Sequence, residues 1–211
     1  TGESVGGPVT ITANETDGDV SETVNVTVEV GEVAAISAGN ETTTAGEEGS
    51  VNVTAQDSEG NAVDNFTADV ANRDSLSLDS TTVSTTDGTA TFTFTENDAG
   101  EFVPRFELNG TSSINTTSTV TVETAPAANV SADNVTVTAN DTADSQQFTV
   151  NVTDSNNNPV DGEVVNVTAD SDGLTGLAVG DNATTVDGIA TFSFNENTTG
   201  NFGVEVALES D

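Results

Sequence analysis

The stretch Asp87-Gly-Thr-Ala-Thr-Phe-Thr-Phe94 decides the fold of this chain. Its apolar residues Ala90, Phe92 and Phe94 alternate with threonines, and this period of two is typical of a half-buried β-strand. The Asp-Gly pair in front of the strand is a turn signal. A near copy, Asp187-Gly-Ile-Ala-Thr-Phe-Ser-Phe194, follows 100 residues later. The pattern therefore predicts a strand that belongs to a repeated unit.

The same alternation runs through most of the chain. Valines at 24, 26, 28 and 30 alternate with polar residues, and residues 51–56 behave in the same way. Threonine and valine are both good strand formers, and no segment has apolar residues at helical spacing. Short strands separated by turn signals predict an all-β fold, an antiparallel sandwich or barrel, with almost no helix. We interpret the recurring phenylalanines as core residues.

Two further matches define the repeat. Asp57-Ser-Glu-Gly-Asn-Ala-Val-Asp64 aligns with Asp154-Ser-Asn-Asn-Asn-Pro-Val-Asp161 at an offset of 97, and Gly100-Glu-Phe102 aligns with Gly200-Asn-Phe202 at an offset of 100. We therefore expect one sandwich at residues 31–124 and a second at 125–211 that lacks its last strand. Residues 24–30 resemble residues 118–124, the closing strand of the first copy, so residues 1–30 are expected to be the closing strands of a preceding domain.

Two explanations account for the incomplete domains expected at the two ends of the sequence. The chain could be cut from a longer array of repeats. Alternatively, the N-terminal strands of one molecule could complete the open C-terminal domain of the next, which would give head-to-tail fibres by strand addition.

The charge is strongly one-sided, with 36 Asp and Glu against 2 arginines and no lysine, a formal net charge of −34. Such a charge opposes compaction in dilute buffer, whereas at molar salt the screening length falls to roughly 3 Å. We interpret the chain as built for concentrated salt. An acidic disordered tail is the rival interpretation, but the acids are scattered among apolar alternations. The absence of basic patches argues against nucleic-acid partners, and no apolar run is long enough for a membrane span.

At the repeated motifs the sequence resembles the bacterial Ig-like domain group 1, the invasin and intimin type of repeat. That family has a D-x-x-G-N-P-V turn, a T-D-G-x-A strand and a T-x-x-x-G-x-F/Y-x-V segment. Here these fall at residues 57–63, 86–90 and 95–103, and again at 154–160, 186–190 and 195–204, with Asn157 in place of the glycine. The resemblance implies tandem immunoglobulin-like Greek-key sandwiches that serve as a rigid stalk or spacer, commonly in adhesins.

The acidic, lysine-free composition looks like that of haloarchaeal surface glycoproteins, including S-layer proteins. Together with the repeat resemblance, it leads us to expect an extracellular structural segment of an S-layer-type assembly, with itself or neighbouring surface subunits as partners. The alternative expectations are an adhesin stalk or a strand-exchanged surface filament.

N-linked glycosylation is the best-supported chemical feature. Fourteen Asn-x-Ser/Thr triplets occur among 22 asparagines, although part of this excess follows from Asn-Val-Thr being a natural outer face of a strand. Acceptor sequons usually lie on exposed loops. The expected sites are those in predicted loops, namely Asn14, Asn40, Asn109, Asn115, Asn140, Asn182 and Asn197.

Two turns are weaker candidates for a hard cation such as calcium. Oxygen-bearing residues alternate around each of them, and alternate oxygens in a tight turn can converge on a cation. The residues are Asp57, Glu59 and Asn61 in the first turn and Asp154, Asn156 and Asn158 in the second. Ordinary hairpin turns are the competing interpretation, because neither has the glycine and later glutamate of an EF-hand.

Enzymatic function is not expected. The chain has no His, Cys, Lys or Tyr, so a Ser-His triad, a Schiff base and a thiolate nucleophile are all excluded, as are disulfides. A carboxylate pair acting on polysaccharides is the catalytic alternative. We expect no organic cofactor.

Overall fold

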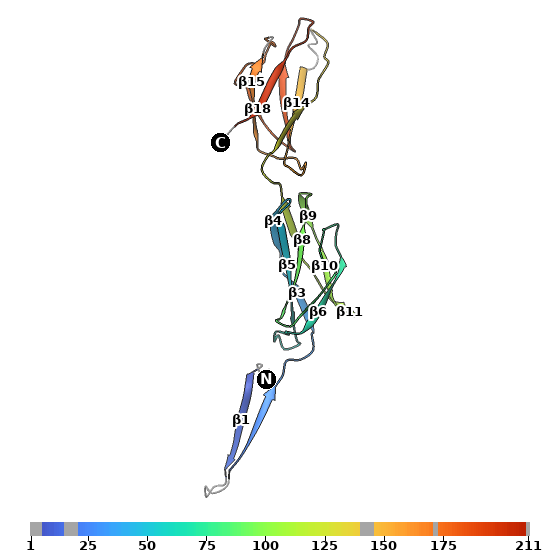
Figure 1. Ribbon diagram of the computed structural model, residues 1–211, viewed down its shortest axis with the longest axis vertical. Coiled ribbons are helices and arrows are strands. Elements are labelled where there is room, and N and C mark those ends of the chain that lie inside the picture. The colour runs from blue at the N-terminus through green and yellow to red at the C-terminus, as the bar shows by residue number, and fades with distance from the viewer. Residues whose placement is uncertain (1–5, 15–20, 140–145, 171–172, 210–211) are drawn as a thin grey trace. The chain divides into compact units, whose positions relative to one another are not determined.

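The computed structural model describes residues 6–14, 21–139, 146–170 and 173–209. Every regular element in these residues is a β-strand, so the prediction of an all-β fold with almost no helix is confirmed (Figure 1). No helix in the described ranges could cross a membrane. Inter-residue contacts divide the chain into two compact units. The first contains Thr1–Thr43, Glu48–Glu96 and Glu101–Thr121, and the second contains Thr44–Glu47, Asn97–Gly100 and Val122–Asp211.

For comparison, residues 31–124 are called the first repeat and residues 125–211 the second repeat. The first repeat contains three sheets, with strand orders β3-β5-β8, β11-β10-β6-β7 and β4-β12-β9. Their bounds are β3 Ala35–Ala38, β4 Glu41–Thr44, β5 Glu48–Gln56, β6 Phe66–Asn72, β7 Thr82–Thr85, β8 Thr89–Thr95, β9 Gly100–Phe102, β10 Arg105–Leu108, β11 Thr111–Thr117 and β12 Val120–Glu123.

The second repeat contains two sheets, with strand orders β13-β14-β17 and β16-β15-β18. Their bounds are β13 Asn129–Ala132, β14 Gln146–Thr153, β15 Val164–Asp170, β16 Asn182–Thr184, β17 Ile189–Phe194 and β18 Val204–Leu208. The first of these sheets corresponds to β3-β5-β8 and the second to β7-β6-β10. Near the N-terminus, β1 (Gly6–Asn14) and β2 (Ser21–Val28) form a separate antiparallel ribbon (Figure 1).

The alternation seen in the sequence becomes the two faces of each strand. In β5, Val51 and Val53 are buried, whereas Asn52 and Thr54 are exposed. On the outer face the hydroxyl of Thr91 donates a hydrogen bond of 2.7 Å to Asn52 Oδ1 across the β5–β8 pair. Valine packing on one face and short polar side chains on the other are what a sheet covered on one side requires.

Phenylalanine rings fill the core of each repeat. Phe92 and Phe106 are fully buried, with ring centroids 4.8 Å apart, and Phe94 lies so close over Gly49 that a Cβ there would come within 2.4 Å of its ring. In the second repeat Phe192 stacks on Phe148 at 5.1 Å. The interpretation of the phenylalanines as core residues agrees with these positions, while Phe102 and its counterpart Phe202 are half-buried.

Candidate functional site

The two turns considered for cation binding are each organised around one buried aspartate. Asp57 is 6% exposed and Asp154 is 0% exposed. Asp57 Oδ1 accepts hydrogen bonds from the backbone N–H groups of Glu59 and Asn61, at 3.0 and 2.8 Å. Asp57 Oδ2 accepts one from the backbone N–H of Gly31, at 3.0 Å. The carboxylate therefore closes its own turn and also holds the residue that leads into the repeat.

Asp154 repeats this arrangement. Its Oδ1 accepts from the backbone N–H groups of Asn156 and Asn158, at 2.8 and 2.9 Å, and its Oδ2 accepts from that of Ala125 at 3.1 Å. We call these two groups the aspartate clamps. A side-chain oxygen that bonds backbone N–H groups two and four residues on stabilises a turn locally.

The two clamp turns differ at the position that needs a left-handed backbone. Gly60 has a φ of 84° in the first turn, and Asn157 has a φ of 71° in the second. Asparagine is one of the few residues besides glycine that adopts this conformation readily. The replacement of the family glycine by Asn157 therefore leaves the turn intact.

The other residues of the predicted cation sites support the clamps. The Asn61 side-chain amide donates to Asp57 Oδ2 at 3.0 Å, and that of Asn158 donates to Asp154 Oδ2 at 2.9 Å. The exposed Glu59 side chain accepts a hydrogen bond from Ser58 Oγ at 2.6 Å. In the described part of the chain no three His, Cys, Asp or Glu side chains form a group that could hold a metal ion. Calcium binding at these turns stays a prediction.

Hydrogen bonding favours the charged form of the clamp carboxylates. The pKa of Asp57 is lowered from 3.8 to about 2. The largest cause is the hydrogen bond from the Asn61 side chain, and the next largest is the hydrogen bond from the Gly31 N–H. For Asp154 burial raises the pKa, but the combined hydrogen bonds from Asn158, Ala125 and Asn156 outweigh it, so the net shift is downward. Both side chains therefore stay ionised at neutral pH and act as hydrogen-bond acceptors.

Two buried glutamates that the sequence analysis did not single out play a similar part. Glu96 and Glu196 are 6% and 7% exposed; Glu96 follows β8 directly, and Glu196 lies two residues after the end of β17. Glu96 Oε2 accepts from the Ser77 N–H, and Glu196 Oε2 accepts from the Thr175 N–H, both at 3.1 Å. Hydrogen bonds from the N–H groups of Thr198 and Thr175 lower the pKa of Glu196 to about 2. Each glutamate thus fixes a long surface loop to the end of a core strand.

The predicted glycosylation sites lie in different settings. Five of them have exposed side chains: Asn40, Asn109, Asn115, Asn182 and Asn197. Asn109 stands in the turn between β10 and β11 and donates to Asp69 Oδ2 at 2.7 Å, and Asn40 Oδ1 accepts from the Thr119 N–H at 2.9 Å. Asn14 is the last residue of β1, and Asn140 lies outside the described residues. Glycan occupancy stays a prediction at all seven.

Comparison with known proteins gives one sequence relative and a set of similar folds. Halomucin of Haloquadratum walsbyi is 42% identical over 76 residues, which is 35% of this chain and 1% of halomucin. No family model matches the chain. Among solved structures, the Escherichia coli adhesin FdeC has a TM-score of 0.50 at 20% identity. The match covers 90% of this chain and 65% of the FdeC chain. The D0-D1 domain of intimin has a TM-score of 0.35 at 23% identity, and the match covers 85% of this chain and 92% of the intimin chain.

The likeness to FdeC concerns the fold. Together with the all-β architecture of the described residues, it confirms the predicted class of tandem immunoglobulin-like β-sandwiches.

Proposed function

We propose that the chain is a structural repeat segment of a cell-surface glycoprotein assembly in an extreme halophile, of the S-layer type. The observation that carries this proposal is the pairing of a net charge of −34 with two rigidly clamped β-sandwiches. The stretch that is 42% identical to halomucin, a protein of Haloquadratum walsbyi, supports the halophilic setting.

The charge and the clamps suit such a role. Carboxylates on the outer faces of the sheets keep their hydration in concentrated salt, where self-repulsion is screened over roughly 3 Å at 1 M. The carboxylates of Asp57, Asp154 and Glu196 accept several N–H hydrogen bonds that lower the pKa of each, so they stay ionised and hold loops in place. Such groups are poorly suited to proton transfer, which needs a carboxyl whose pKa lies near the working pH. The arrangement favours a load-bearing segment over a catalytic one.

The surface carries the features through which such a segment would be decorated. We propose that some of the exposed sequons carry N-linked glycans, with Asn40, Asn109 and Asn182 as the leading sites because each stands at a turn or a strand end. In the assembly, the partners are further copies or neighbouring surface subunits. Contacts between two such acidic faces require salt or divalent cations to offset repulsion.

Immunogold labelling of cells of the source organism, with antibodies raised against the 211-residue chain, tests the location. We expect label on the outer cell surface, arranged with the lattice period in isolated envelopes. Label on thin projections would favour an adhesin stalk, and label confined to the cytoplasm would contradict the proposal. Mass spectrometry of peptides from the native protein then checks the glycans. Unmodified peptides at all exposed sequons would contradict the glycoprotein assignment alone.

A further inference from the structure

An open pocket of about 750 Å³ lies at the end of the first repeat where the chain enters it. The segment 30–33, the residues around the start of β6, and the ends of β10 and β11 line this pocket, and all of them belong to the first compact unit. Its volume falls within the range of about 300–1,000 Å³ that is typical of small-molecule sites. The pocket is therefore large enough to hold sugar rings.

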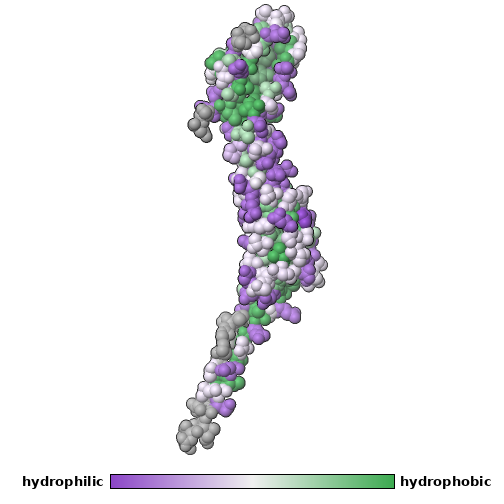
Figure 2. All heavy atoms as spheres, viewed as in Figure 1, coloured by the Kyte–Doolittle hydropathy of each residue, from purple (hydrophilic) through white to green (hydrophobic). Residues whose placement is uncertain are grey.

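Apolar side chains that remain partly exposed form part of the pocket. Val33, Leu108 and Ile114 are half-buried, and Val30 is 37% exposed. Figure 2 shows hydrophobic surface where the segment that joins β2 to β3 meets the first repeat. Neighbouring apolar groups that are partly exposed indicate a surface that gains free energy when an occupant covers it.

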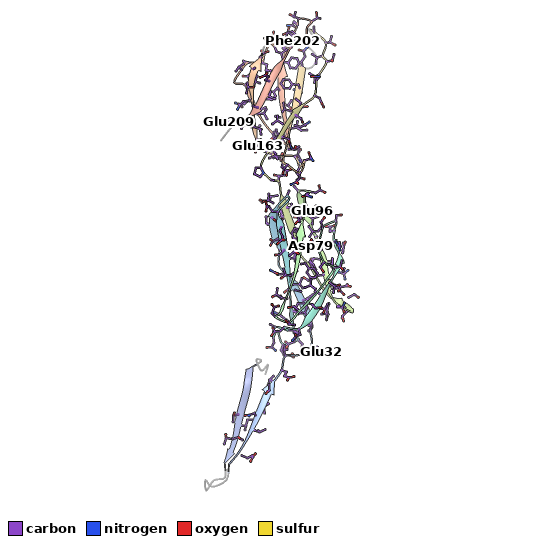
Figure 3. All side chains as sticks on the ribbon, viewed as in Figure 1. Glu32, Asp79, Glu96, Glu163, Phe202 and Glu209 are labelled. Atoms are coloured by element: carbon purple, nitrogen blue, oxygen red, sulfur yellow. The ribbon has the colours of Figure 1, made fainter. Side chains whose placement is uncertain are left out.

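The polar lining of the pocket restricts the class of occupant. The exposed side chains of Glu32 and Asp64 line it, and none of the described residues around it is basic. Figure 3 labels Glu32 in the segment between β2 and β3. A carboxylate accepts hydrogen bonds from hydroxyl groups, whereas it repels anions. A neutral ring with several hydroxyl groups and apolar C–H faces, which is the chemistry of a sugar, suits both parts of the lining.

Two complete Asn-x-Thr sequons border this pocket. Asn65 and Thr67 line it at the start of β6, and Asn109 and Thr111 line it at the turn between β10 and β11. The Asn65 sequon is not simply the outer face of a strand, because Asn65 precedes β6 and the residue after it, Phe66, is buried. An N-linked sugar on either asparagine would therefore start at the rim of the pocket.

The two asparagines differ in whether the side-chain amide is free. Asn109 Nδ2 donates a hydrogen bond of 2.7 Å to Asp69 Oδ2. The Asn65 side chain is exposed, and among the described residues it has no hydrogen-bond partner. Asn65 is thus the acceptor at which no existing hydrogen bond has to be broken. At the repeat offset of 97, Gly162 occupies the equivalent position, so this sequon is particular to the first repeat.

We propose that Asn65 carries an N-linked glycan whose first sugars lie in this pocket. The inference rests on the proposed glycoprotein assignment and adds a site to it. In the transfer, Asn65 Nδ2 forms a bond to the anomeric carbon of an oligosaccharide carried on a lipid phosphate, and the bond from that carbon to the phosphate oxygen breaks. Nδ2 gives up one proton, and the lipid phosphate leaves. The bound sugars cover Ile114 and connect the segment 30–33 to the end of β10.

Mass spectrometry of the native protein tests the modification. We expect the peptide that contains Asn65 to carry a glycan. In chains expressed in the source organism, Thr67→Ala is expected to abolish this glycan, and the matched variant Thr67→Ser, which keeps the sequon, is expected to retain it. An unmodified Asn65 in a chain that carries glycans elsewhere would overturn this inference alone. Unmodified peptides at every sequon would contradict the glycoprotein assignment as well.

A double-mutant cycle in the same host tests whether the glycan lies in the pocket. Because the Asn65 side chain makes no hydrogen bond within the described residues, Asn65→Gln removes the glycan and little else. In thermal melts at 3 M KCl, we expect the losses in Tm from Asn65→Gln and Ile114→Thr to fall short of additivity by at least about 2 °C. The matched control is Val103→Thr, at a 38% exposed valine outside the pocket, and its loss should add to that of Asn65→Gln. Additive losses at Ile114 would show that the sugars do not occupy the pocket, and the inference would then be wrong.

Discussion

The two repeats have the same strand pattern but differ in how their cores are closed. In the first repeat β11 and β12 complete the sandwich, and Phe106, Val120 and Val122 are almost fully buried. In the second repeat Val206, the counterpart of Phe106 on β18, is half-buried, whereas Leu108 and its counterpart Leu208 are half-buried in both repeats. The difference shows that alternation is enough to specify each strand and its inward face, whereas full burial of Phe106 also depends on the strands that cover it, β11 and β12.

Other features are independent of closure. Both repeats bury a clamp aspartate, Asp57 or Asp154, and both bury a loop-holding glutamate, Glu96 or Glu196. These carboxylates bond to backbone N–H groups of loops next to their own strands, so the different burial of Phe106 and Val206 does not affect them. The comparison separates the buried carboxylates, which are the same in both repeats, from the burial of the core, which differs.

Salt is expected to have the largest effect on the two repeats. Dilution from 3 M to 0.1 M KCl lengthens the screening distance from less than about 3 Å to about 10 Å. The carboxylates that give the whole chain its net charge of −34 then repel one another within each sandwich. We expect both repeats to unfold. The second repeat, whose core is less completely buried at Val206, is expected to unfold at the higher salt concentration. Hydrogen exchange measured by mass spectrometry resolves the repeats during dilution. Retention of protected β14 and β5 amides at 0.1 M KCl would contradict this expectation.

Truncation of a core side chain should have a smaller effect than dilution, and the effect should differ between the fully buried Phe106 and the half-buried Val206. Phe106→Ala removes a fully buried ring and is expected to cost about 3–5 kcal/mol of unfolding free energy. Val206→Ala, at the equivalent half-buried position, is expected to cost about 1 kcal/mol or less. Denaturation at constant high salt, followed by circular dichroism, provides the measurement.

The smallest expected effect is that of acid on the aspartate clamps, one of which is present in each repeat. Because folding lowers the pKa of Asp57 from 3.8 to about 2, its contribution to stability is present above pH 3.8 and is lost as the pH falls toward 2. Asp57→Asn cannot offer two acceptor oxygens, so we expect lower stability at neutral pH and a shallower fall in stability between pH 4 and 2. Thermal melts across this range measure both.

Glu59→Gln is the matched control for that variant. It removes a charge from the same turn, but the Glu59 carboxylate contacts Ser58 and not the clamp. A control that flattens the acid dependence as much as Asp57→Asn would show that general charge, and not the clamp, causes the effect.

The strands were predictable because their causes are local. Valine and threonine at alternate positions specify β5 and β8 without help from the rest of the chain, and the turn around Gly60 follows from its motif. The antiparallel pairing of β1 with β2 is a local hairpin and follows from the same alternation. In contrast, the exposure of Val135 and Val137 could not be read from their strand-like pattern, because it depends on whether a partner strand lies beside them.

The site was predictable only in part. Alternate oxygens at Asp57, Glu59 and Asn61 drew attention to the turn, but sequence spacing does not tell whether oxygens face a cation or accept hydrogen bonds from backbone N–H groups. Glu96 and Glu196 were missed, since a single glutamate after a threonine- and phenylalanine-rich strand resembles any exposed acid. Their recurrence at an offset of 100, each followed by asparagine and then by glycine three residues later, was the available signal.

The aspartate clamps have a mechanical consequence. Asp57 and Asp154 bind the N–H groups of Gly31 and Ala125, the residues through which the chain leads into each repeat. Tension applied along the polypeptide would therefore meet a hydrogen bond to a carboxylate, of 3.0 or 3.1 Å, before it reached the first strand of the sheet. The other N–H donors in the same turn hold the aspartate itself in place, so each repeat should resist peeling from its leading end more strongly than a sandwich anchored by strand pairing alone.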